Sequence, residues 1–319
     1  MDCNTLVAVA SLGGTIAMTP TGQGVVPTKS AADLVEGLAV GEVVTLATTP
    51  GASLTFDTLL TALDWAKTQV ERGARGVVIV QGTDTLEETA YFFDCLWPFD
   101  APVVVTGAMR HPALPGADGP ANLAAAVTVA GSPNSSGRGC LLVLNDEVHA
   151  ARWVRKTHSS RLDAFQSAPA GPLGLVAEQE VHYFHPVAER FGALSRPSAV
   201  PSVALLEATL GDDGSLVRAL RVDGAVVAAT GVGHVSTGMA DAIAAAPFPV
   251  VVASRTGAGT TFRRTYGFQG SESDLIARGV LMAGWLCPRK ARILLALLLG
   301  ANASQEQLAD EFEKRGSIW

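Results

Sequence analysis

Short runs of apolar, β-branched residues recur along the first half of the chain. Segments with helical spacing separate these runs, which lie at residues 6–12, 43–47, 76–80, 103–105 and 141–144. Strands that are apolar on both faces are typical of a parallel sheet covered by helices on two sides. The pattern therefore predicts an α/β fold, with a larger N-terminal domain built on a doubly wound, mainly parallel sheet.

One of the expected helices has a clear start signal. It is predicted over residues 86–97, directly after the run at 76–80. Thr85 stands where a helix cap is expected, and Glu88 stands where its side chain can return the bond, as in a capping box. A helix N-terminus is therefore expected close to the end of that strand.

The periodicity fades between residues 186 and 201, where three prolines punctuate the chain. We expect a linker there, between an N-terminal catalytic domain at 1–185 and a smaller C-terminal α/β domain at 202–319. A chain of 319 residues also exceeds what one hydrophobic core usually supports. The last part should end in two helices, with Pro288 at the start of one and Gly300 near its end.

Composition and charge indicate which classes of partner are excluded and in which cellular compartment the protein is expected. The chain has 23 Lys and Arg against 30 Asp and Glu, a net charge of −7, so a nucleic-acid partner is not expected. Four scattered cysteines without a CxxC pair indicate buried thiols in a reducing compartment. The first apolar run breaks at Gly13, so we expect no leader, no membrane span and a cytoplasmic location.

Candidate chemistry lies just after the predicted strands, where open α/β sheets bind ligands. A Gly-Gly turn after the first strand exposes the hydroxyl of Thr15, and Thr83 and Asp84 follow the strand at 76–80. Lys156 is one of only five lysines, and a desolvated lysine can act as a base where arginine cannot. Turns, caps and solvated lysines are also common without function, so these residues alone indicate only an α/β enzyme with a hydroxyl nucleophile.

Several other site classes lack their motifs. The chain has no GxGxxG fingerprint, no Walker loop and no GxSxG elbow. His182 and His185 have ligand-like spacing without a third ligand pattern. Neither a metal nor an organic cofactor is expected.

The order and spacing of the chain's motifs resemble the bacterial-type L-asparaginases. The likeness covers nearly the whole chain, at residues 13–17 (Gly-Gly-Thr-Ile-Ala), 81–91 (Gln-Gly-Thr-Asp-Thr-Leu-Glu-Glu-Thr-Ala-Tyr), 105–110, 117–120, 155–157, 171–174, 231–233 and 290–292. The resemblance implies cofactor-free hydrolysis of L-asparagine to L-aspartate and ammonia, with weaker action on L-glutamine as an accompanying activity. It also implies a homo-oligomer, either a dimer or a dimer of dimers.

The resemblance assigns catalytic roles by position. Thr15 matches the acylated nucleophile, while Thr83, Asp84 and Lys156 match a second catalytic set that relays protons. A threonine would attack the amide carbonyl, ammonia would leave, and water would cleave the acyl-enzyme.

The same likeness assigns substrate contacts. Asp84 would hold the α-ammonium group, Ser53 the α-carboxylate, and Gly14 and Ala108 would line the pocket with backbone atoms. Ser236 falls where an adjacent subunit would add a polar contact.

Two departures from the family pattern affect how Thr15 is activated. The glycine-rich segment 19–27, which could close as a lid or remain a surface loop, has no tyrosine, and the shortened stretch 259–264 has no glutamate. Thr15 would then be activated by water, by Thr21, or by Thr83, Asp84 and Lys156 together, which we call the lysine set. We favour the lysine set. The alternative is a catalytically weak protein on the same fold that binds or senses asparagine or aspartate.

Overall fold

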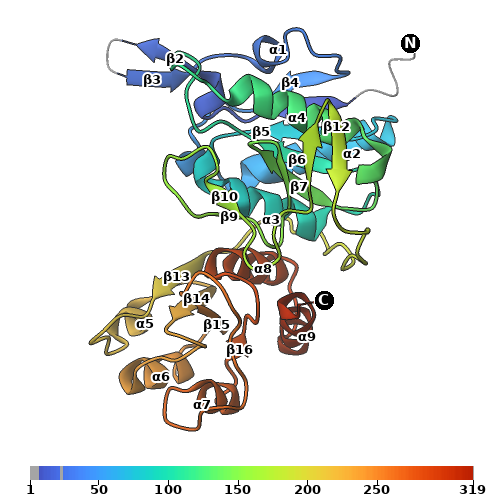
Figure 1. Ribbon diagram of the computed structural model, residues 1–319. Helices are drawn as coiled ribbons and strands as arrows, with labels where there is room; N and C mark the ends of the chain where they lie inside the picture. Colours follow the sequence, from blue (N-terminus) through green and yellow to red (C-terminus); the bar gives the residue numbers. More distant parts are fainter. Residues whose placement is uncertain (1–6, 22–23, 319) are drawn as a thin grey trace. The chain divides into compact units, whose positions relative to one another are not determined.

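The computed structural model describes residues 7–21 and 24–318 (Figure 1). The chain forms two compact units, Met1–Ala193 and Leu194–Trp319. This division falls in the stretch 186–201, where the structure has neither helix nor strand. The exact limits of the linker and of the two domains stay a prediction.

Unit 1 alternates strands with helices, as the apolar runs predict. Its elements are β1 (Ala8–Ser11), η2 (Thr15–Ala17), β2 (Met18–Thr21), β3 (Gly24–Pro27), α1 (Ala31–Leu34), β4 (Val43–Thr45), η3 (Gly51–Ser53), α2 (Phe56–Glu71), β5 (Val77–Val80), η4 (Thr83–Thr85), α3 (Leu86–Leu96), β6 (Val103–Thr106), α4 (Gly119–Gly131), η5 (Pro133–Ser135), β7 (Cys140–Leu144), β8 (Glu147–Ala150), β9 (Arg155–Lys156), β10 (Phe165–Gln166), β11 (Gly174–Ala177) and β12 (Glu180–Tyr183).

Eight of these strands form one mixed sheet in the order β12-β11-β8-β7-β6-β5-β1-β4. The five strands from β7 to β4 are parallel, and β8, β11 and β12 add antiparallel partners at one edge. The mainly parallel α/β prediction is confirmed. Because β1 lies between β4 and β5, the strand order reverses there, and such a switch point is where open sheets bind ligands.

Helices cover both faces of this sheet. Helices α1 and α4 pack on one face, and α2 and α3 pack on the other (Figure 1). Helix α3 connects β5 to β6, and helix α4 connects β6 to β7, so both connections run in the same direction along the sheet. Because α3 and α4 lie on opposite faces, these two crossovers have opposite hands. The crossover through α4 is the left-handed one, since those through α1, α2 and α3 share a single hand and right-handed crossovers are the rule.

The core of unit 1 explains why its central strands are apolar at every position. All four residues of β5 are buried. Val78 and Val80 join a cluster with Leu123 and Val129 of α4, while the intervening residues of β5 point to the other face. Burial on both faces is what the uninterrupted apolar runs predict.

The predicted capping box at the start of α3 is wrong. Thr85 is the N-cap residue, but its side chain accepts no capping hydrogen bond. Its hydroxyl instead donates to the backbone oxygen of Gly51 at 2.9 Å. The tight turn η4 precedes the helix directly, and there the Thr85 side chain joins two loops of the sheet edge.

Unit 2 is a smaller α/β unit, as expected. Its parallel sheet has the order β13-β14-β15-β16, and Pro288 begins α8 while Gly300 ends it, as predicted. Helix α8 covers one face, and α5 and α6 contribute to the core on the other. The elements are β13 (Val203–Glu207), α5 (Ser215–Ala219), β14 (Gly224–Ala229), α6 (Thr237–Ala244), β15 (Val250–Ser254), α7 (Glu272–Ala277), β16 (Leu281–Met282), α8 (Pro288–Gly300) and α9 (Gln305–Gly316).

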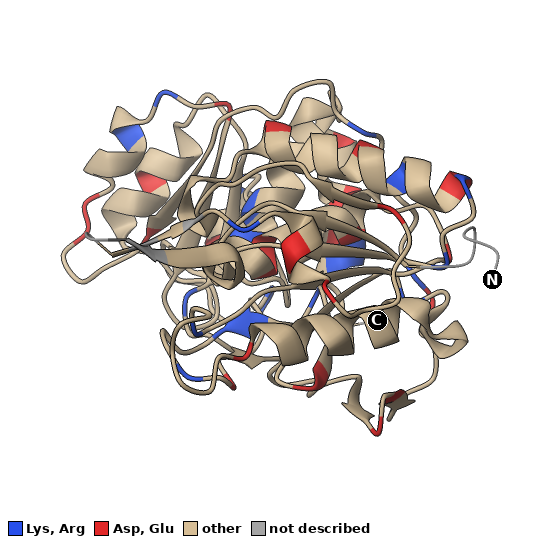
Figure 2. Ribbon diagram, turned by 90° about the horizontal axis from the view of Figure 1, so that it is seen from above, with Lys and Arg blue, Asp and Glu red and all other residues tan. Residues whose placement is uncertain are grey.

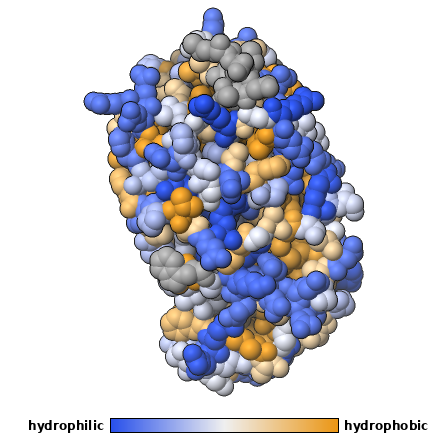
Figure 3. All heavy atoms as spheres, turned by 90° about the vertical axis from the view of Figure 1, so that its right-hand side faces the viewer, coloured by the Kyte–Doolittle hydropathy of each residue, from blue (hydrophilic) through white to orange (hydrophobic). Residues whose placement is uncertain are grey.

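Charged and apolar positions are mixed over the units. Figure 2 shows Lys and Arg interspersed with Asp and Glu along the ribbon, and on the face in Figure 3 apolar side chains form patches among hydrophilic ones. Among the described helices, none is both long and apolar enough to span a membrane. Cys95, Cys140 and Cys287 are buried and form no disulfide, and burial raises the pKa of Cys140. Cys3 lies outside the described residues.

Glycines allow the ends of β1 and β5 to come into backbone contact. Gly14 has φ of +86°, and a Cβ atom there would lie 2.0 Å from the Gly82 nitrogen. A Cβ atom on Gly82 would lie 2.8 Å from the Gly51 nitrogen. No side chain fits at these contacts, so the residues that follow Gly14 and Gly82 emerge at the same end of the sheet.

Replacing Gly14 by alanine should therefore destabilise unit 1 strongly. We expect Gly14→Ala to lower the free energy of unfolding by about 3 kcal/mol or more, measured by urea unfolding. Gly37→Ala is the matched control, because Gly37 has φ of +83° but no atom within 4 Å of its Cβ position. The control should cost about 1 kcal/mol for the left-handed backbone alone. Equal losses in the two variants would contradict the steric explanation.

Candidate active site

Thr15 lies directly after the Gly14 turn, on the short helix η2. The next two residues, Ile16 and Ala17, are buried and anchor this turn in the core, whereas Thr15 itself is half-buried. Among the described residues, nothing forms a hydrogen bond with the Thr15 hydroxyl. Thr15 is thus a partly exposed residue at the switch point.

Thr83, Asp84 and Lys156 meet at the end of the neighbouring strand β5. Lys156 Nζ donates to Thr83 Oγ1 at 2.8 Å and lies 3.6 Å from Asp84 Oδ1. Thr83 is 5% exposed, whereas the Asp84 side chain is 60% exposed. The structure thus joins a buried hydroxyl to an amine, with an accessible carboxylate beside them.

Lys156 reaches this place from a separate hairpin. Strands β9 and β10 pair antiparallel, with Lys156 opposite Phe165, and form a two-stranded sheet of their own. The backbone N–H of Lys156 donates to the buried Glu87 carboxylate. Glu87 was not among the residues singled out from the sequence, because there it reads as an ordinary acidic residue in the first turn of a helix.

The side chains of Asp118 and Asn122 form a polar clamp that fixes the loop containing Ala108. Ala108 is fully buried, and the next two backbone N–H groups, of Met109 and Arg110, donate to the Asp118 carboxylate at 2.9 and 2.8 Å. The Asn122 amide donates both to Asp118 at 2.9 Å and to the Gly107 oxygen at 3.0 Å. The clamp holds the carboxyl end of β6 against the start of α4.

The turn η3 lies beside the loop that follows β5. Gly51 packs against the backbone of Gly82, and Ser53 ends this turn with an exposed side chain. The structure therefore brings Ser53 into the same group of loops as Gly14 and Thr83. No described group of three or more His, Cys, Asp or Glu side chains is arranged to hold a metal ion.

Comparison with known proteins agrees with this geometry. The N-terminal asparaginase model matches residues 6–189, and the glutaminase/asparaginase C-terminal domain model matches residues 202–312. The chain belongs to the asparaginase family. The resemblance inferred from the sequence motifs is confirmed.

Individual relatives match nearly the whole length of this chain. A probable L-asparaginase of Deinococcus radiodurans is 38% identical, with 96% of each chain covered. An L-asparaginase of Bacillus licheniformis is 35% identical over 97% of this chain and 99% of its own. The crystal structure of a probable cytoplasmic L-asparaginase from Campylobacter jejuni superposes with a TM-score of 0.87 at 30% identity, covering 97% and 99% of the two chains.

The glycine-rich segment 19–27, expected to be either a lid or a surface loop, belongs to a β-hairpin. Strands β2 and β3 pair antiparallel from Met18 opposite Pro27 to Thr21 opposite Gly24. The hairpin begins three residues after Thr15, and the Thr19 and Thr28 hydroxyls hydrogen bond at its base, 2.6 Å apart. Gly22, Gln23 and the Thr21 side chain lie outside the described parts, so the role predicted for Thr21 remains a prediction.

Ser236 lies in unit 2, where it caps helix α6. Its hydroxyl accepts a hydrogen bond from the Met239 N–H at 3.1 Å and donates to the Asp212 oxygen. A side chain used in this way has a local structural role. The predicted contact with substrate in an adjacent subunit remains a prediction.

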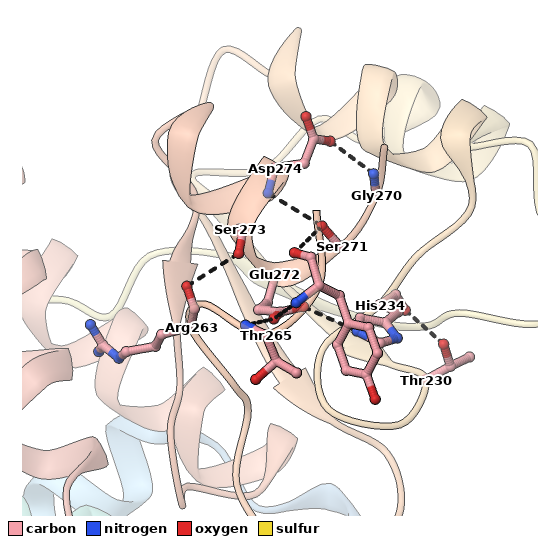
Figure 4. Close-up of polar contacts among 10 residues, drawn as sticks. Thr230, His234, Arg263, Thr265, Gly270, Ser271, Glu272, Ser273 and Asp274 are labelled. Atoms are coloured by element: carbon pink, nitrogen blue, oxygen red, sulfur yellow. Dashed lines mark hydrogen bonds and ion pairs between the residues drawn. The ribbon is translucent and has the colours of Figure 1, made fainter. Parts of the chain in front are cut away.

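Unit 2 contains a second polar cluster, centred on the fully buried Glu272 (Figure 4). Its carboxylate accepts the Thr265 and Tyr266 N–H groups at 2.7 Å each, and its Oε2 lies 3.1 Å from His234 Nε2. The His234 ring packs edge-on against Tyr266 and Phe268. Burial opposes ionisation of Glu272, but the hydrogen bonds outweigh it, so the pKa of this carboxyl lies below its ordinary value.

This lowered pKa predicts an acid-sensitive contribution to stability. Ionised Glu272 stabilises the fold above the ordinary carboxyl pKa of 4.5, and the contribution is lost as the pH falls through the lower folded-state value. Glu272→Gln should reduce the free energy of unfolding by about 2 kcal/mol at pH 7. The difference from the native protein should shrink below pH 4.5.

Urea unfolding across this pH range measures the effect. Asp310→Asn, at an exposed position of α9 in the same unit, controls for the loss of one negative charge. The free energy of unfolding of Glu272→Gln is compared with that of the native protein at each pH. If this difference stayed constant from pH 7 to pH 3, ionisation of Glu272 would not support the fold.

Proposed function

We propose that this protein is an L-asparagine amidohydrolase that releases L-aspartate and ammonia through a threonyl acyl-enzyme. The observation that supports this most is the 2.8 Å contact between Lys156 Nζ and Thr83 Oγ1, with Asp84 beside it. The Gly14–Gly82 contact sets this group next to the loop that exposes Thr15. Membership of the asparaginase family and the names of its relatives agree with the proposal.

Substrate binding would use groups that remain exposed at the switch point. The Asp84 carboxylate can pair with the α-ammonium group of asparagine, because most of its side chain is accessible. The Ser53 hydroxyl, on the turn that packs against Gly82, can donate to the α-carboxylate. Between them, the side-chain amide would lie against the backbone of Gly14 and Ala108.

In the first step, Thr15 Oγ1 forms a bond to the amide carbon. The hydroxyl proton passes to the amide nitrogen, the carbon–nitrogen bond breaks, and ammonia leaves. Backbone N–H groups near Thr15 and Thr83 would stabilise the negative charge that develops on the amide oxygen. We assign the activation of Thr15 to the lysine set, because the contact between Gly14 and Gly82 brings the loops that hold Thr15 and Thr83 together.

In the second step, water cleaves the β-acyl ester. The water oxygen bonds to the acyl carbon, the bond to Thr15 Oγ1 breaks, and Thr15 recovers a proton. Lys156 in its amine form can take the water's proton through the Thr83 hydroxyl, which it already contacts. Asp84 stabilises the ammonium form that results, and the same proton returns to Thr15 Oγ1 as the ester bond breaks, so the amine is regenerated.

Three finer properties belong to the same proposal. Action on L-glutamine should be weaker, since one added methylene changes discrimination by about 10- to 200-fold. The likeness to a probable cytoplasmic L-asparaginase of Campylobacter jejuni supports a cytoplasmic location. We also propose a homo-oligomer, a dimer or a dimer of dimers, which light scattering can test.

Ammonia release tests the proposal directly. The native protein should release ammonia from L-asparagine, and Thr15→Ala should reduce kcat by about 10³-fold or more, as expected for loss of a nucleophile. Lys156→Met should reduce kcat by a similar order, because it removes the proton acceptor. Lys314→Met, at an exposed position of α9, should keep native turnover.

Two outcomes would contradict the proposal. Aspartate binding without ammonia release from L-asparagine, L-glutamine or D-asparagine would identify a binding or sensing protein. Full turnover by a folded Lys156→Met would show that the lysine set does not move the protons.

A further inference from the structure

Glu87 is a buried acidic residue next to the candidate active site. It stands in the first turn of α3, three residues after Asp84, and is 2% exposed. A buried carboxylate is costly unless it accepts hydrogen bonds. One of its oxygens, Oε2, accepts the backbone N–H of Lys156, a residue 69 positions away in the chain.

The pairing of β9 with β10 explains why Lys156 needs this acceptor. The N–H of Thr157 donates to the Ala164 oxygen at 2.7 Å, which makes the neighbouring pair, Lys156 and Phe165, the non-hydrogen-bonded type. In such a pair the backbone N–H groups point away from the partner strand. The Lys156 N–H therefore has no acceptor on β10, and the Glu87 carboxylate provides one.

The hairpin's place depends on contacts of this kind. Strands β9 and β10 are not hydrogen-bonded to the eight-stranded sheet. Glu87 is only four residues after Thr83, on the helix that η4 leads into. A bond from Glu87 to the Lys156 backbone thus fixes the base of the lysine side chain relative to the hydroxyl that its Nζ contacts.

We infer that Glu87 is a positioning residue for Lys156, holding its backbone so that Nζ lies within hydrogen-bond distance of Thr83 Oγ1. The lysine side chain has four rotatable bonds, and restraint at its base reduces the positions that the amine can occupy. The effect on turnover rests on the proposed function, whereas the placement of Lys156 does not.

Two substitutions separate the acceptor from the volume of the side chain. Glu87→Gln keeps an amide oxygen that can accept the Lys156 N–H, and Glu87→Leu removes the acceptor at similar size. We expect Glu87→Leu to reduce kcat for L-asparagine by about 100-fold, as for a small misplacement of a catalytic group, with KM changed only a few-fold. Glu87→Gln should retain most of the native kcat.

A double-mutant cycle distinguishes positioning from a general effect on the fold. In a Lys156→Met background, Glu87→Leu should cause no further loss of kcat, because no amine remains to be placed. An equal loss in both backgrounds would overturn the inference. Glu71→Leu, at the exposed end of α2, should keep native turnover and controls for the removed charge.

A spectroscopic measurement tests the placement without reference to turnover. In protein labelled with ¹³C at lysine Cε, the Lys156 signal is identified among the five lysines by its absence in Lys156→Met. Glu87→Leu should move this signal toward those of solvent-exposed lysines, and Glu87→Gln should leave it near its native position. An unchanged Lys156 signal in Glu87→Leu would overturn the inference, even in a protein that releases no ammonia.

The two proposals can therefore fail separately. A native protein that releases no ammonia while its Lys156 signal responds to Glu87→Leu would refute the amidohydrolase and keep the positioning role. If the native protein releases ammonia, but Glu87→Leu changes neither the Lys156 signal nor kcat, the positioning role is refuted and the amidohydrolase is kept.

Discussion

The candidate active site depends on two backbones that lie closer together than side chains would allow. Gly14 ends the first strand's turn and Gly82 follows the adjacent strand, and neither position has room for a Cβ atom. This contact occurs where the strand order reverses, between β5 and β1. Because each glycine is followed by a threonine, the same contact determines where both hydroxyls emerge from the sheet.

The other groups reach this point through long-range hydrogen bonds. Lys156 comes from a hairpin outside the main sheet, and its side chain and backbone both bond to the segment after β5. Asp118 holds the loop after β6 through two backbone N–H groups. The candidate site is therefore assembled by tertiary contacts, which bring together the turn after β1, the start of α3 and the β9–β10 hairpin.

Much of the fold could be predicted from periodicity. Runs that are apolar at every position correspond to central strands covered on both sides, and Pro288 and Gly300 mark the ends of α8. The capping box failed because Thr85 bonds to Gly51, a partner 34 residues away that no local pattern reveals.

Some residues of the candidate site could also be predicted from the sequence, and others could not. Thr15, Thr83 and Asp84 were predictable because residues after parallel strands gather at one edge of a sheet. The placement of Lys156 followed from family resemblance, since its separation from Thr83 is 73 residues. Glu87 and Asn122 could not be found from the sequence, because an acid or amide on a helix shows its partner only after the chain folds.

The central claim is that the hydroxyl exposed after Gly14 is the nucleophile, with the lysine set moving protons. The most direct test is intact-protein mass spectrometry of the native protein, acid-quenched during turnover of L-asparagine, followed by peptide mapping. The account predicts an adduct with the mass of one aspartyl group on the peptide containing Thr15, and no adduct in Thr15→Ala. An adduct on the peptide containing Thr83, or ammonia release without any adduct, would contradict it.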